Sequence, residues 1–72
     1  MTYKIISKRQ DSDTLLTTVE YNFDGVILTI DVPHFQPQSV KEVITGIENR
    51  GVSEERKLNA VKLITETIIP IL

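Results

Sequence analysis

The chain has 72 residues, of which 40% are hydrophobic and 25% are charged, and this predicts one folded domain over residues 1–72. It contains no cysteine and a single histidine, His34, which excludes disulfides and zinc sites built on cysteine or histidine. Its formal net charge of -2 disfavours binding to nucleic acid or anionic lipid, and no apolar run approaches the ~20 residues of a membrane span. Because the N-terminus also lacks a secretory signal, we expect a cytoplasmic protein.

The first predicted element is a strand over Tyr3–Arg9, followed by a polar three-residue loop at 11–13. This loop length places the apolar side chains of the strand on the same face as those of the next strand. It also pairs Lys4 with Glu20, which have opposite charges.

The clearest local pattern is Asp24-Gly25, which lies between two alternating runs, Leu15–Phe23 and Val26–Val32. Asp-Gly accommodates the positive φ angles of a two-residue type I′ turn, so the two runs are predicted to form a β-hairpin. The turn fixes a register in which one face is apolar and the other mostly polar. The expected pairs on the apolar face are Phe23 with Val26, Tyr21 with Leu28, Val19 with Ile30, and Thr17 with Val32.

Pro33 and Pro37 follow the hairpin, and we expect them to end the strand and hold an extended connector. A first helix is then predicted to begin near Pro37 and to end at Gly51. Its buried stripe has the spacing i, i+3, i+4 and i+7. The members of this stripe are Val40, Val43, Ile44 and Ile47.

A second helix is predicted to begin at Ser53, the cap residue, and to end before Pro70. Its stripe should join the first helix and the apolar sheet face in one core. The predicted fold class is therefore α+β, a three-stranded antiparallel meander packed on one face by a two-helix hairpin (βββαα). The stripe consists of Leu58, Val61, Ile64, Thr65 and Ile68.

Two groups of polar residues are weak candidates for chemistry. Asp11 and Asp13 bracket a loop position, but the further oxygen ligands of an EF-hand are absent, so a plain turn is favoured over a calcium site. His34 could act as a base with Asp31 and Ser39, but their spacing indicates no catalytic triad. We favour a loop histidine, exposed or packed beside Phe35, and expect no enzyme, cofactor, metal or small-molecule substrate.

The last residues offer more apolar surface than a chain terminus normally exposes. Such a patch usually marks an interface, although the segment could also fold back onto its own core. Both arrangements stay open at this point. The residues predicted for the interface are Ile68, Ile69, Ile71 and Leu72.

Several segments together resemble short phage- or prophage-type proteins of unassigned function. They are Val19–Gly25, Ile30–Pro37 and Ile47–Arg50, all of which lie within residues 19–50. The resemblance implies a small structural or assembly-related protein and names no functional residue.

The expected function is therefore that of a non-enzymatic protein-interaction or assembly protein that forms homo-oligomers through its C-terminal residues. The alternative is a nucleic-acid-binding accessory protein that uses the first strand and the outer sheet face. Its basic side chains would be Lys4, Lys8 and Arg9.

Overall fold

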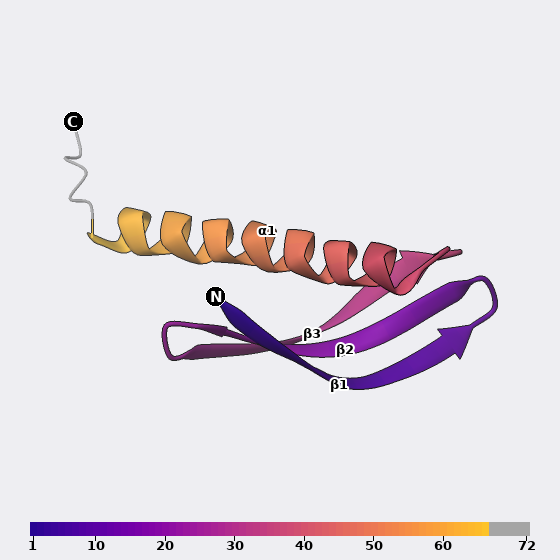
Figure 1. Ribbon diagram of the computed structural model, residues 1–72. Helices are drawn as coiled ribbons and strands as arrows, with labels where there is room; N and C mark the ends of the chain where they lie inside the picture. The colour runs from indigo at the N-terminus through magenta and orange to yellow at the C-terminus, as the bar shows by residue number, and fades with distance from the viewer. Residues whose placement is uncertain (67–72) are drawn as a thin grey trace.

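The computed structural model describes residues 1–66 as one antiparallel sheet and one long helix (Figure 1). The strands are β1 (Thr2–Asp11), β2 (Thr14–Phe23) and β3 (Val26–Phe35), in the order β1-β2-β3. Helix α1 (Val40–Glu66) lies over one face of the sheet. The α+β class and the three-stranded meander are thus confirmed, whereas the two-helix hairpin is not present in this part of the chain.

The hairpin of β2 and β3 has the predicted register. Asp24 and Gly25 have φ angles of 52° and 97°, the positive values that a type I′ turn requires. The backbone N–H of Gly25 donates to Oδ1 of Asn22 at 2.8 Å, which further stabilises the turn. Phe23 pairs with Val26, and buried side chains alternate with half-buried ones along β2 from Thr17 to Phe23.

The hairpin of β1 and β2 has the predicted pairing at its open end, but its loop differs from the prediction. Lys4 lies opposite Glu20 as expected, but the connecting loop has two residues, Ser12 and Asp13, instead of three. A bulge at Ile6 absorbs the difference, because an extra residue in one strand shifts the register by one. The predicted loop was therefore wrong, although the register of the first half of β1 was correct.

Strand β3 continues to Phe35, so the prediction that Pro33 ends it was wrong. Pro33 pairs with Leu16 within the ladder. Proline is tolerated here because β3 is an edge strand, on which the missing N–H can face away from the sheet. This extension brings His34 into the sheet, opposite Leu15.

Helix α1 passes through Gly51 without a break, so the predicted end at Gly51 and the predicted cap at Ser53 were both wrong. Gly51 does not have the positive φ of a C-terminal cap. A Cβ atom there would lie 2.8 Å from Cε1 of Tyr21 and would also clash with Met1. The glycine therefore permits close approach of helix and sheet, at an intrinsic helix cost of about 1 kcal/mol.

A side-chain pair, Arg50 with Glu54, also spans the predicted break. Nε of Arg50 contacts Oε1 of Glu54 at 3.0 Å, and Nζ of Lys57 lies 3.4 Å from the same oxygen. The hydrogen bond from Arg50 holds the pKa of the Glu54 carboxyl below its usual value. Such pairs at i, i+4 and i, i+3 favour one continuous helix.

The N-terminus of α1 is capped as expected for a helix that begins after Pro37. Oγ of Ser39 accepts a hydrogen bond from the N–H of Glu42 at 3.2 Å. The Glu42 carboxylate in turn accepts from the N–H of Gln38 at 2.7 Å. This resembles a capping box, which satisfies backbone donors that have no partner within the helix.

The hydrophobic core lies where α1 crosses β2. Tyr21 and Ile47 meet there, and Gly46 allows the helix to approach His34, whose Nδ1 would lie 3.1 Å from a Cβ atom at position 46. Val61, predicted to belong to the core, is instead exposed. The buried apolar residues among the described ones are Val19, Tyr21, Phe23, Val32 and Ile47, with Tyr3, Leu28, Ile30, Val43 and Leu58 packed around them.

Candidate interaction surface

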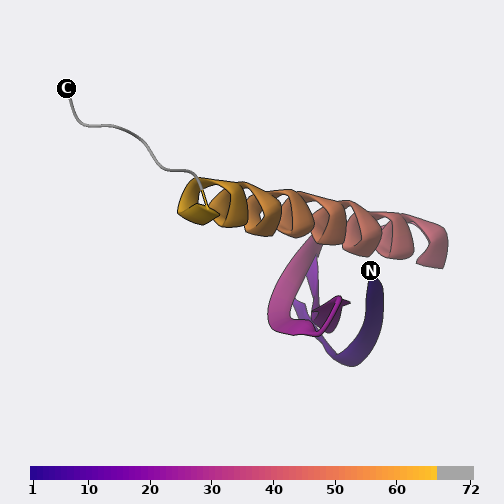
Figure 2. The same ribbon diagram turned by 90° about the vertical axis from the view of Figure 1, so that its left-hand side faces the viewer.

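The C-terminal half of α1 extends past the sheet. Figure 2 shows its last turns reaching beyond the strands. Ile47 marks the crossing point, and the 19 residues from there to Glu66 span about 28 Å of helix. The helix therefore packs against the sheet as far as Leu58, and residues 59–65 of its C-terminal half are all exposed.

Apolar side chains continue along this uncovered half. Val61 follows Ile47 by fourteen positions, which returns it close to the sheet-facing side of the helix. It is nevertheless 61% exposed, and Ile64 is 69% exposed. Of the stripe that was predicted from the sequence, Leu58 packs against the core, whereas Val61 and Ile64 are exposed.

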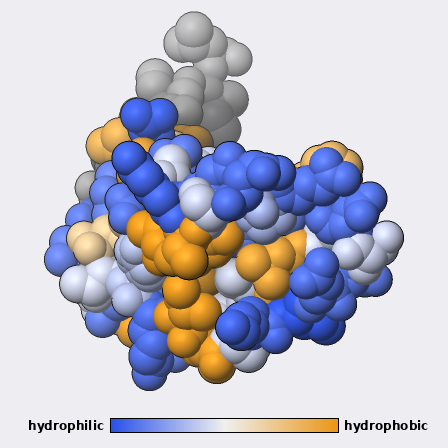
Figure 3. Space-filling model, turned by 45° about the vertical axis from the view of Figure 1, so that its right-hand side comes forward, coloured by the Kyte–Doolittle hydropathy of each residue, from blue (hydrophilic) through white to orange (hydrophobic). Residues whose placement is uncertain are grey.

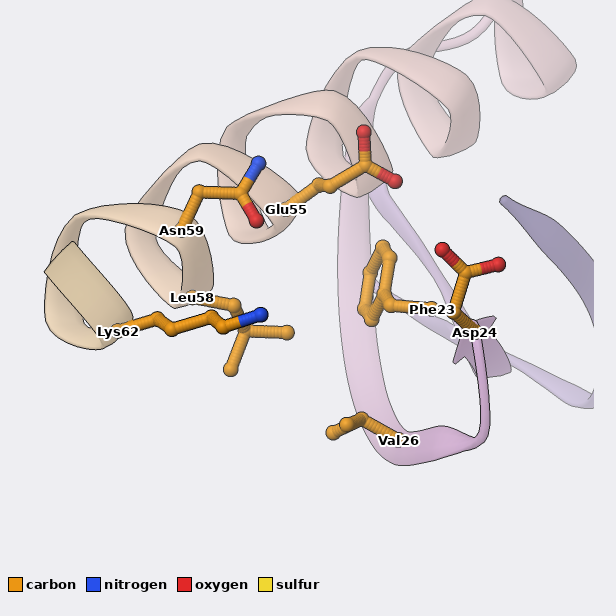
Figure 4. Close-up of a pocket in the computed structure, with 7 residues that line it drawn as sticks. All are labelled: Phe23, Asp24, Val26, Glu55, Leu58, Asn59 and Lys62. Carbon is orange, nitrogen blue, oxygen red and sulfur yellow. The ribbon is translucent and has the colours of Figure 1, made fainter. Parts of the chain in front are cut away.

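A hollow of about 420 Å³ opens between α1 and the turn of the β2–β3 hairpin, and we call it the wedge. Figure 4 shows Leu58 and Lys62 reaching from the helix toward the hairpin, where Phe23 and Val26 face them. Three of its lining residues are apolar, and we call the four polar ones its rim. The wedge is lined by Phe23, Asp24, Val26, Glu55, Leu58, Asn59 and Lys62.

The wedge was not predicted from the sequence. Val26 and Leu58 were each predicted to lie on an apolar face, one of the sheet and one of a helix. The open gap between them depends on α1 continuing straight past Gly51. Had the helix ended at Gly51, a second helix would have been free to fold back over the hairpin. Only the continuous helix leaves this space.

The outer sheet face also carries apolar residues. Ile6 and Ile27 are about half exposed, and Phe35 is 75% exposed. Figure 3 shows a band of hydrophobic surface between hydrophilic regions on one side of the molecule. Exposed apolar side chains therefore occur on the outer sheet face as well as on the C-terminal half of α1.

His34 is buried, in contrast to the predicted loop histidine. It is 8% exposed, and its Nε2 forms a hydrogen bond of 2.9 Å with Oγ1 of Thr17. The same hydroxyl donates to the carbonyl oxygen of Val32 at 3.4 Å. Burial lowers the pKa of His34, since the charged form loses solvation in this position.

The structure does not bring the other candidates for chemistry to His34. Asp31 belongs to the outer face of β3, where its Oδ1 accepts from Oγ1 of Thr18 at 2.7 Å, whereas His34 belongs to the inner face. Ser39 is engaged as the helix cap. A smaller hollow of about 260 Å³ joins His34 to Glu42, but Asp31 and Ser39 do not line it.

The aspartates around the first loop have ordinary structural positions. Asp11 ends β1, while the carbonyl oxygen of Asp13 accepts from the N–H of Gln36 at 2.9 Å. Within residues 1–66, no three side chains of histidine, aspartate or glutamate gather as metal ligands would.

The basic residues of β1 are divided between the two sheet faces. Nζ of Lys4 lies 3.9 Å from the carboxylate of Glu20 on the outer face. The bulge at Ile6 pairs Lys8 with the inward-facing Thr17, so the expectation that Lys8 lies on the outer face was wrong. The three basic side chains thus form no continuous row along β1.

The predicted interface residues Ile68, Ile69, Ile71 and Leu72 lie outside the described residues. What the structure describes is the surface that precedes them, namely the uncovered helix half and the wedge. In residues 1–66, no helix has the length and apolar character needed to span a membrane.

The fold and this surface define a small α+β domain with one helix laid across a three-stranded meander. Comparison with known proteins adds no relative: no protein family matches the chain, and no curated protein or solved structure is significantly similar to it.

Proposed function

We propose that this chain is a non-enzymatic assembly protein that associates with copies of itself through the C-terminal half of α1 and the residues that follow it. The observation that carries the proposal is the apolar stripe of α1, which continues through Val61 beyond the sheet that covers its first half. Burial of one such aliphatic side chain stabilises a complex by ~1.5–3 kcal/mol. A second copy with the same stripe would provide that burial.

The shape of the molecule supports this proposal. Its radius of gyration is 15.6 Å, and its principal extents are 53 × 25 × 18 Å. A compact domain of this length has a radius of gyration of about 11 Å. An elongated small domain buries less of its apolar surface than a compact one, and a partner subunit is a common remedy.

The uncharged sequence after α1 provides a second support. Residues 68–72 read Ile-Ile-Pro-Ile-Leu, and they continue directly from the uncovered helix half. A contiguous apolar patch usually marks an interaction site. The resemblance to short phage-type proteins agrees with an assembly role and remains a prediction.

Sedimentation equilibrium tests the proposal. We expect the full chain to gain mass with concentration, and a chain shortened to residues 1–68 to remain monomeric over the same range. Circular dichroism establishes that the shortened chain keeps its fold. A full chain that is monomeric at every concentration would contradict the proposal.

A further inference from the structure

We propose that the wedge is the binding site for residues 68–72 of a second copy of this chain. The inference rests on the proposed self-association and adds the surface that receives the segment. It assigns a binding role to Val26 and Leu58, which face each other across the gap (Figure 4).

The lining of the wedge suits an uncharged aliphatic segment. Phe23, Val26 and Leu58 offer apolar surface, while Asp24, Glu55 and Lys62 place two negative charges and one positive charge on the rim. A charged occupant would meet a like charge there, whereas an aliphatic one gains burial against the apolar residues. A combination of apolar and polar lining residues is typical of protein interfaces.

The sequence after α1 argues that the segment comes from another copy. To enter its own wedge, the chain would have to reverse direction just after Glu66 and run back about 12 Å toward Leu58. Such a reversal normally uses glycine or asparagine in the left-handed region. Residues 67–70 are Thr-Ile-Ile-Pro, three β-branched residues and a proline, which disfavour that conformation.

Two neighbouring residues of β3 provide a matched test. Val26 and Ile27 are 48% and 50% exposed, but Val26 lines the wedge while Ile27 faces the opposite side of the sheet. We expect Val26→Glu to weaken self-association about tenfold, because a carboxylate replaces one aliphatic contact. Ile27→Glu should leave association unchanged, and circular dichroism verifies that both variants are folded.

The absence of cysteine in the native chain permits a direct test of which copy supplies the segment. Asn59→Cys places a thiol on the wedge rim, and Ile71→Cys places one in the segment. The two variants, one of them ¹⁵N-labelled, are mixed and oxidised, and we expect disulfide-linked pairs of mixed mass. Thr29→Cys, on the outer face of the sheet, serves as the control in place of Asn59→Cys.

The outcomes separate the two proposals. The wedge is not the binding site if Asn59→Cys gives no more mixed-mass pairs than the control Thr29→Cys does. This holds even if sedimentation shows association. A further variant carries both Asn59→Cys and Ile71→Cys in one chain. If it forms an internal disulfide as a monomer, the segment binds its own wedge, and the proposed binding to a second copy is wrong. A monomeric native chain would instead reject the proposed function itself.

Discussion

The hydroxyl group of Tyr21 donates a hydrogen bond to the backbone carbonyl oxygen of Ile47, with 2.6 Å between the two oxygen atoms. Both residues are fully buried, and 26 positions of the chain separate them. The bond joins the central strand to α1 at the point where the helix crosses the sheet. It depends on Gly51, one helical turn later, which leaves room for the tyrosine ring.

Tyr21→Phe should therefore lower the free energy of unfolding by about 1 kcal/mol, the usual net contribution of one hydrogen bond. The helical carbonyl of Ile47 can keep its partner within the helix, so the loss should not exceed this by much. Urea denaturation measures it. Tyr3→Phe is the control, because its exposed hydroxyl lies 3.3 Å from Glu48 and should contribute little. Equal stability of the Tyr21→Phe variant and the native chain would contradict the expected contribution.

Stability should depend on the ionisation of His34. Since burial lowers its folded-state pKa below the ordinary value of 6.5, the unfolded chain binds more protons than the folded chain as the pH falls through that value. The neutral histidine thus stabilises the fold fully above about pH 6.5, and this stabilisation is lost below it as the pH approaches the folded-state pKa. Glu42 lines the same hollow as His34. It is present both in the native chain and in the His34→Gln variant that tests this prediction.

Urea denaturation at about pH 7.5 and about pH 5.5 measures the effect. His34→Gln keeps an amide that can bond to Thr17 and does not titrate, so its unfolding midpoint should change less between the two pH values. The same change in the variant as in the native chain would assign the pH dependence to other groups.

Two serines distinguish the single helix from the predicted pair. Ser39 caps α1, so Ser39→Ala should lower the free energy of unfolding by about 1 kcal/mol. Ser53 lies exposed inside the helix, where alanine is the better helix former, so Ser53→Ala should be neutral or slightly stabilising. Thermal unfolding of both variants makes the comparison. A loss at Ser53 as large as that at Ser39 would instead support a second helix that begins there.

Polar substitutions on the uncovered half of α1 should affect association and leave folding unchanged. Val61 and Ile64 contact little in the described chain, so Val61→Thr and Ile64→Thr together should barely shift the unfolding midpoint of the monomer at high dilution. They should weaken self-association about tenfold or more, since two aliphatic contacts lose burial. Val52→Thr is the control, because Val52 is also exposed but lies on the side of the helix away from the sheet. Unchanged association in the double variant would contradict the assignment of this surface.

Local turn chemistry made most of the sheet predictable. Asp24-Gly25 sets the register of β2 and β3, and the alternation around Tyr21 identifies the buried face. The bulge at Ile6 was not predictable, because a three-residue loop and a two-residue loop with a bulge give the same pairing at Lys4. The continuation of β3 through Pro33 depends on its position at the sheet edge, which is a property of the whole topology.

The single helix was missed because glycine has two distinct uses. At Gly51 the sequence pattern of a C-terminal cap coincides with a site of close packing against Tyr21, and only the tertiary contact decides between them. The wedge follows from the same contact, since it exists only if α1 stays straight past the hairpin turn. The predicted stripe was right at Leu58, which packs against the core, but wrong at Val61 and Ile64, because the pattern alone does not say where the sheet ends beneath the helix.

Hydrogen exchange of the backbone amides from Asn59 to Glu66, measured on the full chain at low and high concentration, tests the central claim most directly. If a second copy covers this half of α1, these amides should exchange quickly in dilute solution and become protected as the concentration rises. Amides at the crossing point, such as that of Ile47, should be protected at both concentrations. Equal exchange of residues 59–66 at every concentration would contradict the account.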